Sequence, residues 1–311
     1  MGIGAILDRA FRLYRQNFVR FIAIVAIVVV PVSLLNVLLI SAQVDAMLAR
    51  AVEGSSRAAM AATRQLGYLM LGAALLAGIA QLLSTAALIK AVSGTYLGRR
   101  MSVGQSYSAV IGKLLPLLGF VLVMILLMIP VAIVGGLLIG VATTIHWIAV
   151  VLAMLAMLVV MLLIVLRYYL TIHAVVIENK PVFQGMTRSS TLSAGYRGKM
   201  FLLFVAIIII SVIASLAFGW IAAKIVPDPG FEDMASPGRL RETLMQTLVI
   251  RGLIELVGEI LIVPIGAAAF ILFYYDLRIR KEGFDLEMLA EAIGEQAPQT
   301  ETPSDGGLPT A

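Results

Sequence analysis

Residues 114–166 read LLPLLGFVLVMILLMIPVAIVGGLLIGVATTIHWIAVVLAMLAMLVVMLLIVL, and they contain no Asp, Glu, Lys or Arg. One crossing of a bilayer needs about 20 apolar residues, so this stretch is long enough for two crossings. A turn between them is indicated by the polar and aromatic residues Thr143, Thr144, His146 and Trp147. The chain is therefore expected to be an integral membrane protein.

The composition of the whole chain agrees with this expectation. It is 61% hydrophobic and 13% charged, whereas a soluble globular chain carries roughly 25% charged residues. The apolar runs are continuous and do not alternate, which predicts helices and not a β-barrel. We predict an all-α integral membrane protein with six transmembrane helices, near residues 19–41, 67–90, 115–142, 147–170, 200–224 and 247–275.

Lys and Arg gather in the segments on one side of the predicted spans, which are residues 1–20, 90–113, 167–199 and 276–311. These segments hold 16 basic residues against 6 on the other side, and Arg251 lies inside the sixth span. Cytoplasmic flanks carry the excess of Lys and Arg in membrane proteins. We therefore expect both termini in the cytoplasm and the chain in a bacterial cytoplasmic (inner) membrane.

The formal net charge of +5 does not indicate nucleic acid, because the basic residues flank the spans. Membrane phospholipids with anionic headgroups are the expected partners, and another membrane or peripheral protein is a further candidate partner. The chain has no cysteine, which excludes disulfides and a thiol nucleophile. No cofactor is expected.

Three cytoplasmic segments have the pattern of an elbow helix, an amphipathic helix that lies in the headgroup plane before the chain turns into the bilayer. The first covers Gly2–Phe18, the second begins at the N-cap residue Ser102, and the third begins at Pro181. We expect apolar faces that include Ile111 in the second and Phe183 in the third. Each precedes an odd-numbered span, so the chain is either a threefold helix-plus-hairpin repeat or has cytoplasmic loops that are amphipathic because they adjoin a membrane.

The segments outside the spans differ in character. Residues 44–64 are expected to continue a helix beyond the membrane, and Pro227–Pro237 to form an irregular turn. Leu286–Ile293 is expected to form a short helix. We assign residues 1–290 to one polytopic membrane domain and residues 291–311 to a disordered tail.

The sixth span carries Arg251, Glu255 and Glu259 at intervals of four, on one face of the helix. A charge at the bilayer centre costs on the order of 3 kcal/mol, so these side chains should face the helix bundle or water. They could line a proton, cation or solute path, or Arg251 could pair with Glu255 in a structural role. A cavity at the two glutamates would favour transport, and a dry contact paired with arginine would favour a scaffold.

Other polar or small residues in the spans carry less chemistry. Neither His146 nor His173 has a partner at metal-ligand spacing, and we expect no metal site. Gly136 and Gly140 are predicted to allow a close helix contact. The sequence has no nucleophile elbow and no phosphate-binding glycine loop, so no catalytic residues are assigned.

Three segments together resemble the bacterial glycerophosphoryl diester phosphodiesterase membrane domain family. They are Gly4-x-x-x-Asp8-x-Ala10-Phe11-Arg12-Leu13-Tyr14-Arg15-x-x-Phe18, then Ile177-Glu178-Asn179-Lys180 with Arg188-Ser189 and Leu192, and finally YYDLRIRKEGFD at residues 274–285. The resemblance covers roughly residues 1–290. In members fused to the enzyme, the phosphodiesterase is a separate barrel whose His-Arg-Gly motif this chain lacks. The resemblance therefore implies a membrane-embedded accessory or lipid-associated role and no hydrolysis.

The charged residues of these segments also have a physical explanation. We expect Arg12, Arg15, Arg188, Arg278, Arg280 and Lys281 to contact the interface and anionic headgroups. Asp276 and Glu282 are expected to pair with arginines of the elbow helices, Glu178 to pair with Arg188, and Gly283 to end the sixth helix. The leading hypothesis is a structural, accessory or lipid-associated protein, and the alternative is a carrier of a small solute or lipid that uses Arg251, Glu255 and Glu259.

Overall fold

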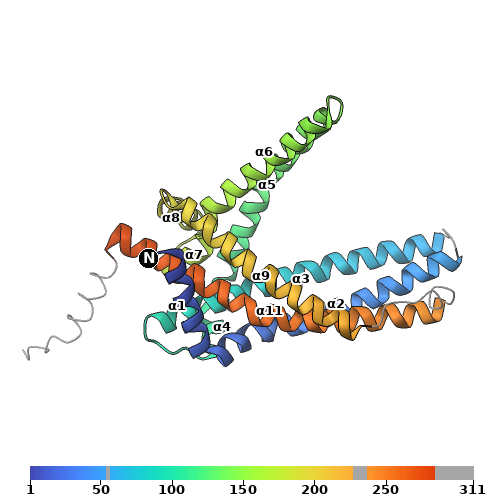
Figure 1. Ribbon diagram of the computed structural model, residues 1–311, viewed down its shortest axis with the longest axis horizontal. Coiled ribbons are helices and arrows are strands. Elements are labelled where there is room, and N and C mark those ends of the chain that lie inside the picture. Colours follow the sequence, from blue (N-terminus) through green and yellow to red (C-terminus); the bar gives the residue numbers. More distant parts are fainter. Residues whose placement is uncertain (54–56, 227–236, 284–311) are drawn as a thin grey trace, which may run out of the picture.

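The computed structural model describes residues 1–53, 57–226 and 237–283 (Figure 1). In this part of the chain all regular structure is helical. The helices are α1 (Ile3–Gln16), α2 (Phe18–Glu53), α3 (Arg57–Tyr96), α4 (Val103–Ile111), α5 (Leu114–Thr143), α6 (Trp147–Tyr168), α7 (Thr171–Glu178), α8 (Val182–Ser193), α9 (Arg197–Ile225) and α11 (Pro237–Glu282).

Six segments of this structure are long and apolar enough to cross a membrane. They are α2, α3, α5, the consecutive helices α6 and α7, α9 and α11, and each contains one predicted span. The prediction of an all-α membrane protein with six spans is confirmed. The third span matches most closely, since α5 extends only one residue beyond each end of the predicted range 115–142.

The spans form three hairpins, α2–α3, α5–α6 and α9–α11 (Figure 1). A short helix precedes each hairpin: α1, α4 and α8 respectively. The predicted order of elbow helix and hairpin is therefore present three times. Figure 1 also shows that the α5–α6 hairpin diverges from the other two hairpins, which run alongside each other.

The short helices begin where the sequence places their caps. Ser102 accepts a hydrogen bond from the Gln105 backbone N–H, and the Gln105 side chain accepts one from the Ser102 backbone N–H, which makes a capping box at the start of α4. Pro181 is the N-cap of α8. At the other end of the chain, α11 ends at Glu282 because Gly283 adopts a φ of 63°, as predicted.

The buried faces of α4 and α8 differ from the predicted ones. Ile111 and Phe183 are exposed, and α8 instead turns the small residues Gly185 and Ser189 toward the protein. A Cβ on Gly185 would lie 3.1 Å from a methyl group of Val175 in α7. The close approach of α7 and α8 selects small residues at these positions, while Phe183 faces outward and Leu192, also on the predicted face, is buried.

On the side away from α1, three helices extend beyond the predicted spans. The helices α2, α3 and α11 contain 36, 40 and 46 residues, whereas about 20 are needed to cross the hydrocarbon. The prediction that residues 44–64 continue a helix is confirmed for its described part, and α11 begins at Pro237, ten residues before the predicted sixth span. Arg241 of α11 and Asp45 of α2 form an ion pair in this extension, with Nε and Oδ1 2.5 Å apart.

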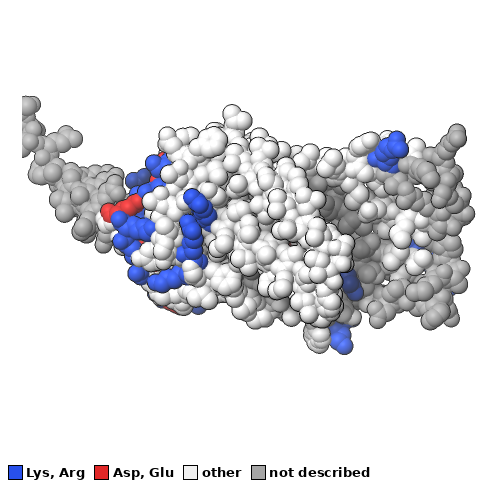
Figure 2. Space-filling view, turned by 90° about the horizontal axis from the view of Figure 1, so that it is seen from above, with Lys and Arg blue, Asp and Glu red and all other residues white. Residues whose placement is uncertain are grey.

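The best-packed part of the molecule lies at the opposite end, where every residue from Ala268 to Leu277 of α11 is buried. The helices α1, α2, α3, α8 and α9 all contact α11. Lys and Arg side chains gather at this same end, and a broad uncharged surface follows it (Figure 2). We call this part of the structure the basic end.

The predicted turn Pro227–Pro237 lies outside the described residues except for Pro237, which is instead the first residue of α11. The predicted helix at 286–293, the domain boundary at residue 290 and the predicted tail also lie outside the described residues.

Candidate functional site

Glu255 and Glu259 lie on α11 between α2 and α9. A cavity of about 390 Å³ separates them from α9, and its lining includes Ser211 and Ser215. A second cavity of about 290 Å³ separates them from α2, and its lining includes Ser33 and Asn36. We name this arrangement the acidic pocket; its polar lining residues are Ser33, Asn36, Ser211, Ser215, Glu255 and Glu259.

The acidic pocket adjoins a larger space toward the outer extension. A cavity of about 630 Å³ lies against α2 and α3 and shares Ile40 and Leu248 with the cavity beside α2. Glu255 and Glu259 are themselves exposed in the isolated chain. The pocket therefore opens to the surface of the protein, and the larger cavity adjoins it on the side away from the basic end.

The depth of the pocket follows from helix geometry. Glu259 is 19 residues from Arg278, a distance of about 29 Å along α11 at 1.5 Å per residue. A hydrocarbon core is about 30 Å thick. If the basic end marks one interface, Glu259 lies near the opposite edge of the hydrocarbon core, where a charge costs less free energy than at the centre. Glu255 is one turn, about 6 Å, farther from the basic end.

Close packing on either side of the glutamates keeps α9 near α11. A Cβ on Gly258 would lie 2.9 Å from a ring carbon of Phe218 in α9, so only glycine fits without movement of that ring. Within the described residues, no ion pair or hydrogen bond joins Arg251 to Glu255, so the structure does not contain the pair suggested by their spacing. The carboxylates thus face the pocket without an adjacent cation.

A second group of charged residues ties three helices together at the basic end. Arg188 of α8 donates to Glu178 of α7, with Nε 2.9 Å from Oε2, and to both carboxylate oxygens of Glu282 of α11. Arg278 of α11 lies 3.5 Å from Glu178 and 3.3 Å from Glu282. Burial lowers the pKa of Arg188, but the hydrogen bonds to Glu282 and Glu178 outweigh that effect, so its pKa is raised. We call Glu178, Arg188, Arg278 and Glu282 the charge network.

The predicted pairs Glu178–Arg188 and Glu282–Arg188 are confirmed by the charge network. The expectation for Asp276 is wrong, because it pairs with no elbow-helix arginine. Asp276 contacts the amino group of Met1 at 2.6 Å and Nε of Arg280, one turn along α11, at 2.9 Å. Asp276 is buried, and these two groups are the cations within its reach.

The residues predicted to contact headgroups fall into two classes in the structure. Lys281 donates to the backbone oxygens of Thr191 and Ala194 at the end of α8. Arg188, Arg278 and Arg280 are bound by carboxylates of the protein itself. By contrast, Arg12 and Arg15 are exposed on α1, and Arg12 contacts only Asp8 on its own helix. Four of the six candidates therefore fix the protein's own helices, while the two on α1 face outward.

Sequence reasoning did not identify the buried tyrosines at the end of the sixth span. The hydroxyl group of Tyr274 donates to Glu178, and the hydroxyl groups of Tyr275 and Ser93 are 2.5 Å apart. Their signal in the sequence is the adjacent pair of tyrosines at the end of the apolar stretch of α11. Such a hydroxyl must find a polar partner when its ring is buried.

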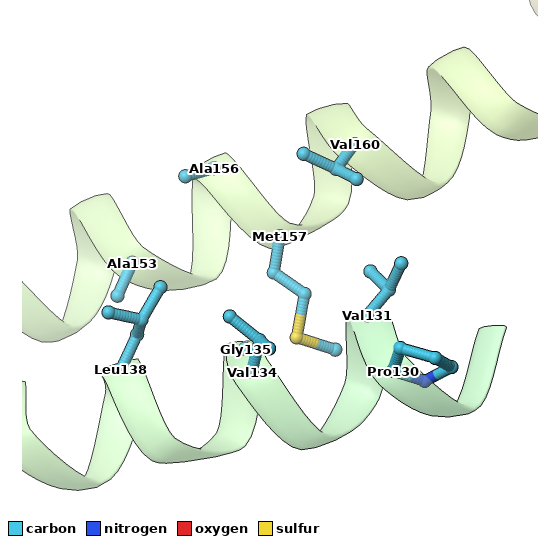
Figure 3. Close-up of a pocket in the computed structure, with 9 residues that line it drawn as sticks. All are labelled: Pro130, Val131, Val134, Gly135, Leu138, Ala153, Ala156, Met157 and Val160. Atoms are coloured by element: carbon cyan, nitrogen blue, oxygen red, sulfur yellow. The ribbon is translucent and has the colours of Figure 1, made fainter. Parts of the chain in front are cut away.

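A fourth cavity has an apolar lining and lies between α5 and α6, with a volume of about 320 Å³ (Figure 3). Met157 of α6 projects from its helix toward α5 beside Gly135 (Figure 3). The glycine contact was predicted at the wrong residues: Gly136 and Gly140 have no neighbour within 4 Å of an added Cβ, whereas a Cβ on Gly135 would collide with Sδ of Met157.

Within the described residues, no group of three or more His, Cys, Asp or Glu side chains is arranged to hold a metal ion. His146 accepts a hydrogen bond from the Ile148 backbone N–H at the start of α6, and His173 is buried against the ring of Tyr274. His146 thus caps a helix, and His173 packs in the protein interior.

Comparisons with known proteins bear on this fold. The sequence of residues 1–277 matches the family described as "Domain of unknown function (DUF7847)". No curated protein and no solved structure matches the chain. The resemblance to the glycerophosphoryl diester phosphodiesterase membrane domain stays a prediction. Because the match includes all six candidate spans almost to the end of the last, the chain belongs to the DUF7847 family.

Proposed function

We propose that this chain is a multi-pass protein of the bacterial cytoplasmic membrane, with both termini in the cytoplasm, that binds a cation-bearing amphiphile or small solute in the acidic pocket. The observation that carries the proposal is that Glu255 and Glu259 line two cavities at once, one against α2 and one against α9. No basic side chain is among the lining residues of either cavity.

The chemistry of the pocket fits a protonated amine. Two carboxylates one helical turn apart repel each other, and a bound cation removes that repulsion and favours their ionised form. Side chains of Ser33, Asn36, Ser211 and Ser215 supply further hydrogen-bonding groups for an ammonium head. An amphiphile would place its head at the carboxylates while its alkyl tail stays in the hydrocarbon of the bilayer, so the tail is not exposed to water.

Binding is tested with purified protein in nanodiscs. A long-chain primary amine is titrated below the concentration at which it forms micelles, and binding is followed by fluorescence of Trp220, which lies on α9 beside the pocket residue Gly219. A Trp147→Phe background leaves Trp220 as the only tryptophan. Saturable binding of the amine, lost in Glu255→Gln and Glu259→Gln, is the expected result.

Two controls make the test specific. Glu242→Gln removes a carboxylate from an exposed position of the same helix that lines none of the described cavities, and it should bind the amine normally. An uncharged alcohol of the same chain length should not bind with comparable affinity. Equal binding of the alcohol, or equal loss in all three variants, would contradict a site at the acidic pocket.

An accessory role is the second candidate, and a different observation favours it. The α5–α6 hairpin diverges from the rest of the chain and is exposed along apolar residues such as Leu126, Leu137 and Leu155 (Figure 1). A partner membrane protein would fit there. Affinity purification in mild detergent with mass spectrometry tests it: a stoichiometric protein that is lost when the hairpin is substituted supports the accessory role.

A further inference from the structure

The uncharged polar side chains of the acidic pocket make no hydrogen bond within the described residues. They are Ser33 and Asn36 of α2 and Ser211 and Ser215 of α9. A hydroxyl group elsewhere on α2 behaves differently, since Ser41 donates to the backbone oxygen of Leu38 at 2.7 Å. The hydrogen-bonding capacity of the pocket is therefore available to whatever occupies its two cavities.

The depth of Ser33 and Ser211 makes water a poor partner for them. Both α2 and α9 start directly after a short helix of the basic end. From the first residue of its helix, each serine is about 21–23 Å along the axis at 1.5 Å per residue. They lie inside a hydrocarbon core of about 30 Å, and deeper than Glu259. A hydroxyl group without a partner there is costly in free energy, so a ligand that bonds to it is favoured.

An ammonium group alone leaves part of this capacity unused. It carries only donors, so it can bond to the two carboxylates and to serine oxygens, but it accepts nothing from Nδ2 of Asn36 or from a serine O–H. The two cavities, of about 390 and 290 Å³, are also much larger than an ammonium group, which is about the size of a water molecule at roughly 30 Å³. A ligand that satisfies the pocket carries uncharged oxygen acceptors as well as a cation.

We propose that the acidic pocket is selective for an amphiphilic amino alcohol, an amine with hydroxyl groups between its ammonium group and its alkyl chain. The ammonium group binds at Glu255 and Glu259, and the hydroxyl groups exchange hydrogen bonds with the deeper serines. A hydroxyl group both donates and accepts, and it carries no negative charge for the carboxylates to repel. This inference rests on the proposed amine binding and goes beyond it by naming the other groups that the ligand carries.

The test compares 2-aminododecane-1,3-diol with 2-aminododecane, two amines that differ only in two hydroxyl groups. Each is titrated into the full chain in nanodiscs, with the Trp220 fluorescence assay described above. Wild-type protein should bind the diol about tenfold more tightly, the effect of one or two net hydrogen bonds. Ser33→Ala and Ser211→Ala should each reduce this ratio of affinities, and the double variant should bring it close to one. The affinity for 2-aminododecane should change little in all three variants, which also shows that they are folded.

Ser41→Ala is the matched control, because it removes a hydroxyl group of α2 that already has a partner and lines none of the described cavities. It should keep the wild-type ratio. Equal affinity of wild type for the two amines would overturn the inference while the amine site itself stands. A tenfold ratio in the double variant, or an equal loss in Ser41→Ala, would do the same. If wild type bound neither amine, the proposed amine site and this inference would both be overturned.

Discussion

Arg188 is the residue on which the basic end depends most. Its guanidinium group binds carboxylates from two other helices, Glu178 of α7 and Glu282 of α11. A lysine has the charge but not the planar fork, so it could not bind both acids in this way. The Arg188 side chain is 21% exposed and that of Glu178 only 11% exposed, so loss of the arginine leaves partly buried acids without a partner.

Arg188→Gln is therefore expected to destabilise the protein by about 2 kcal/mol or more, because breaking a buried pair strands the remaining charge. The stability of Arg188→Lys should lie between that of Arg188→Gln and that of wild type. Thermal unfolding in detergent, followed by circular dichroism, measures the effect. Arg12→Gln is the control: its pair with Asp8 is exposed on both sides and should contribute little. Similar midpoint shifts for Arg188→Gln and Arg12→Gln would argue against the charge network.

Lys113 gives a pH dependence whose sign is fixed by its pKa. The pKa is about 8 in the folded chain and 10.5 for an ordinary lysine, so between these values the unfolded chain binds more protons. Stability therefore rises with pH through this window, and the unfavourable contribution of the charged amine is fully present below pH 8. In delipidated protein, the thermal midpoint of wild type should rise relative to that of Lys113→Gln between pH 7.5 and pH 10. A constant difference would mean that the Lys113 pKa is not lowered.

At the scale of single residues, the sequence predicted contacts that local chemistry determines. Glu178 and Arg188 were paired correctly because they flank one short loop. Asp276 was paired incorrectly because its partners are the amino group of Met1 and an arginine on its own helix. The second cavity wall at Ser211 and Ser215 was not predicted, since which helix packs against α11 depends on the whole fold.

Among the helices, α5 and α6 depend on one close contact. Gly135 of α5 leaves the space that Met157 of α6 occupies (Figure 3). The span limits of this hairpin were predicted well because hydropathy is a local property. The residue at the contact was not, because adjacent glycines differ only in which one faces the neighbouring helix.

Gly135→Ala is expected to destabilise the protein by about 1–3 kcal/mol, the usual cost of overpacking a well-filled contact. Combining it with Met157→Ala should recover most of that loss, since the sulfur atom that the new methyl group would meet is gone. Gly136→Ala is a matched control with open space at its Cβ and should cause no loss. Thermal midpoints of the four proteins decide the matter, and an equal loss in Gly136→Ala would contradict the contact.

The short helices show where sequence reasoning reaches its limit. Their start points at Ser102 and Pro181 were correct, because a cap is made by residues within one turn. The buried face of α8 was not, because Gly185 and Ser189 are buried only by the close approach of α7. Small residues fit a helix contact that no apolar periodicity reveals.

For the whole molecule, the distribution of charge along the six spans predicts one orientation. The basic end should face the cytoplasm, and the turn between α5 and α6 should lie on the outside. Because the chain contains no cysteine, a single introduced cysteine can be labelled without background.

Thr144→Cys, in the α5–α6 turn, should react with a membrane-impermeant maleimide in intact spheroplasts. Ser108→Cys, exposed on α4 at the basic end, should react only after the membrane is permeabilised. Both positions are exposed in the folded chain, so access from the aqueous phase decides the outcome. The reverse pattern of labelling would place the termini outside.

The number of spans followed from the sequence, whereas the arrangement of the hairpins did not. Hydropathy does not specify that α5–α6 diverges from α2–α3, or that α11 lies between α2 and α9. Those relations arise from contacts between residues that are far apart in the chain, such as Gly258 with Phe218.

The contact of α1 with α11 has a consequence for how the protein is made. Ile6, Ala10 and Tyr14 of α1 are buried in the same core as the last helix. Helix α1 is synthesised first, but its apolar face cannot be fully buried until α11 has been synthesised. Until residues 265–277 have been synthesised and inserted, α2, α3 and α9 lack their common neighbour, and their packing is completed only after translation of α11.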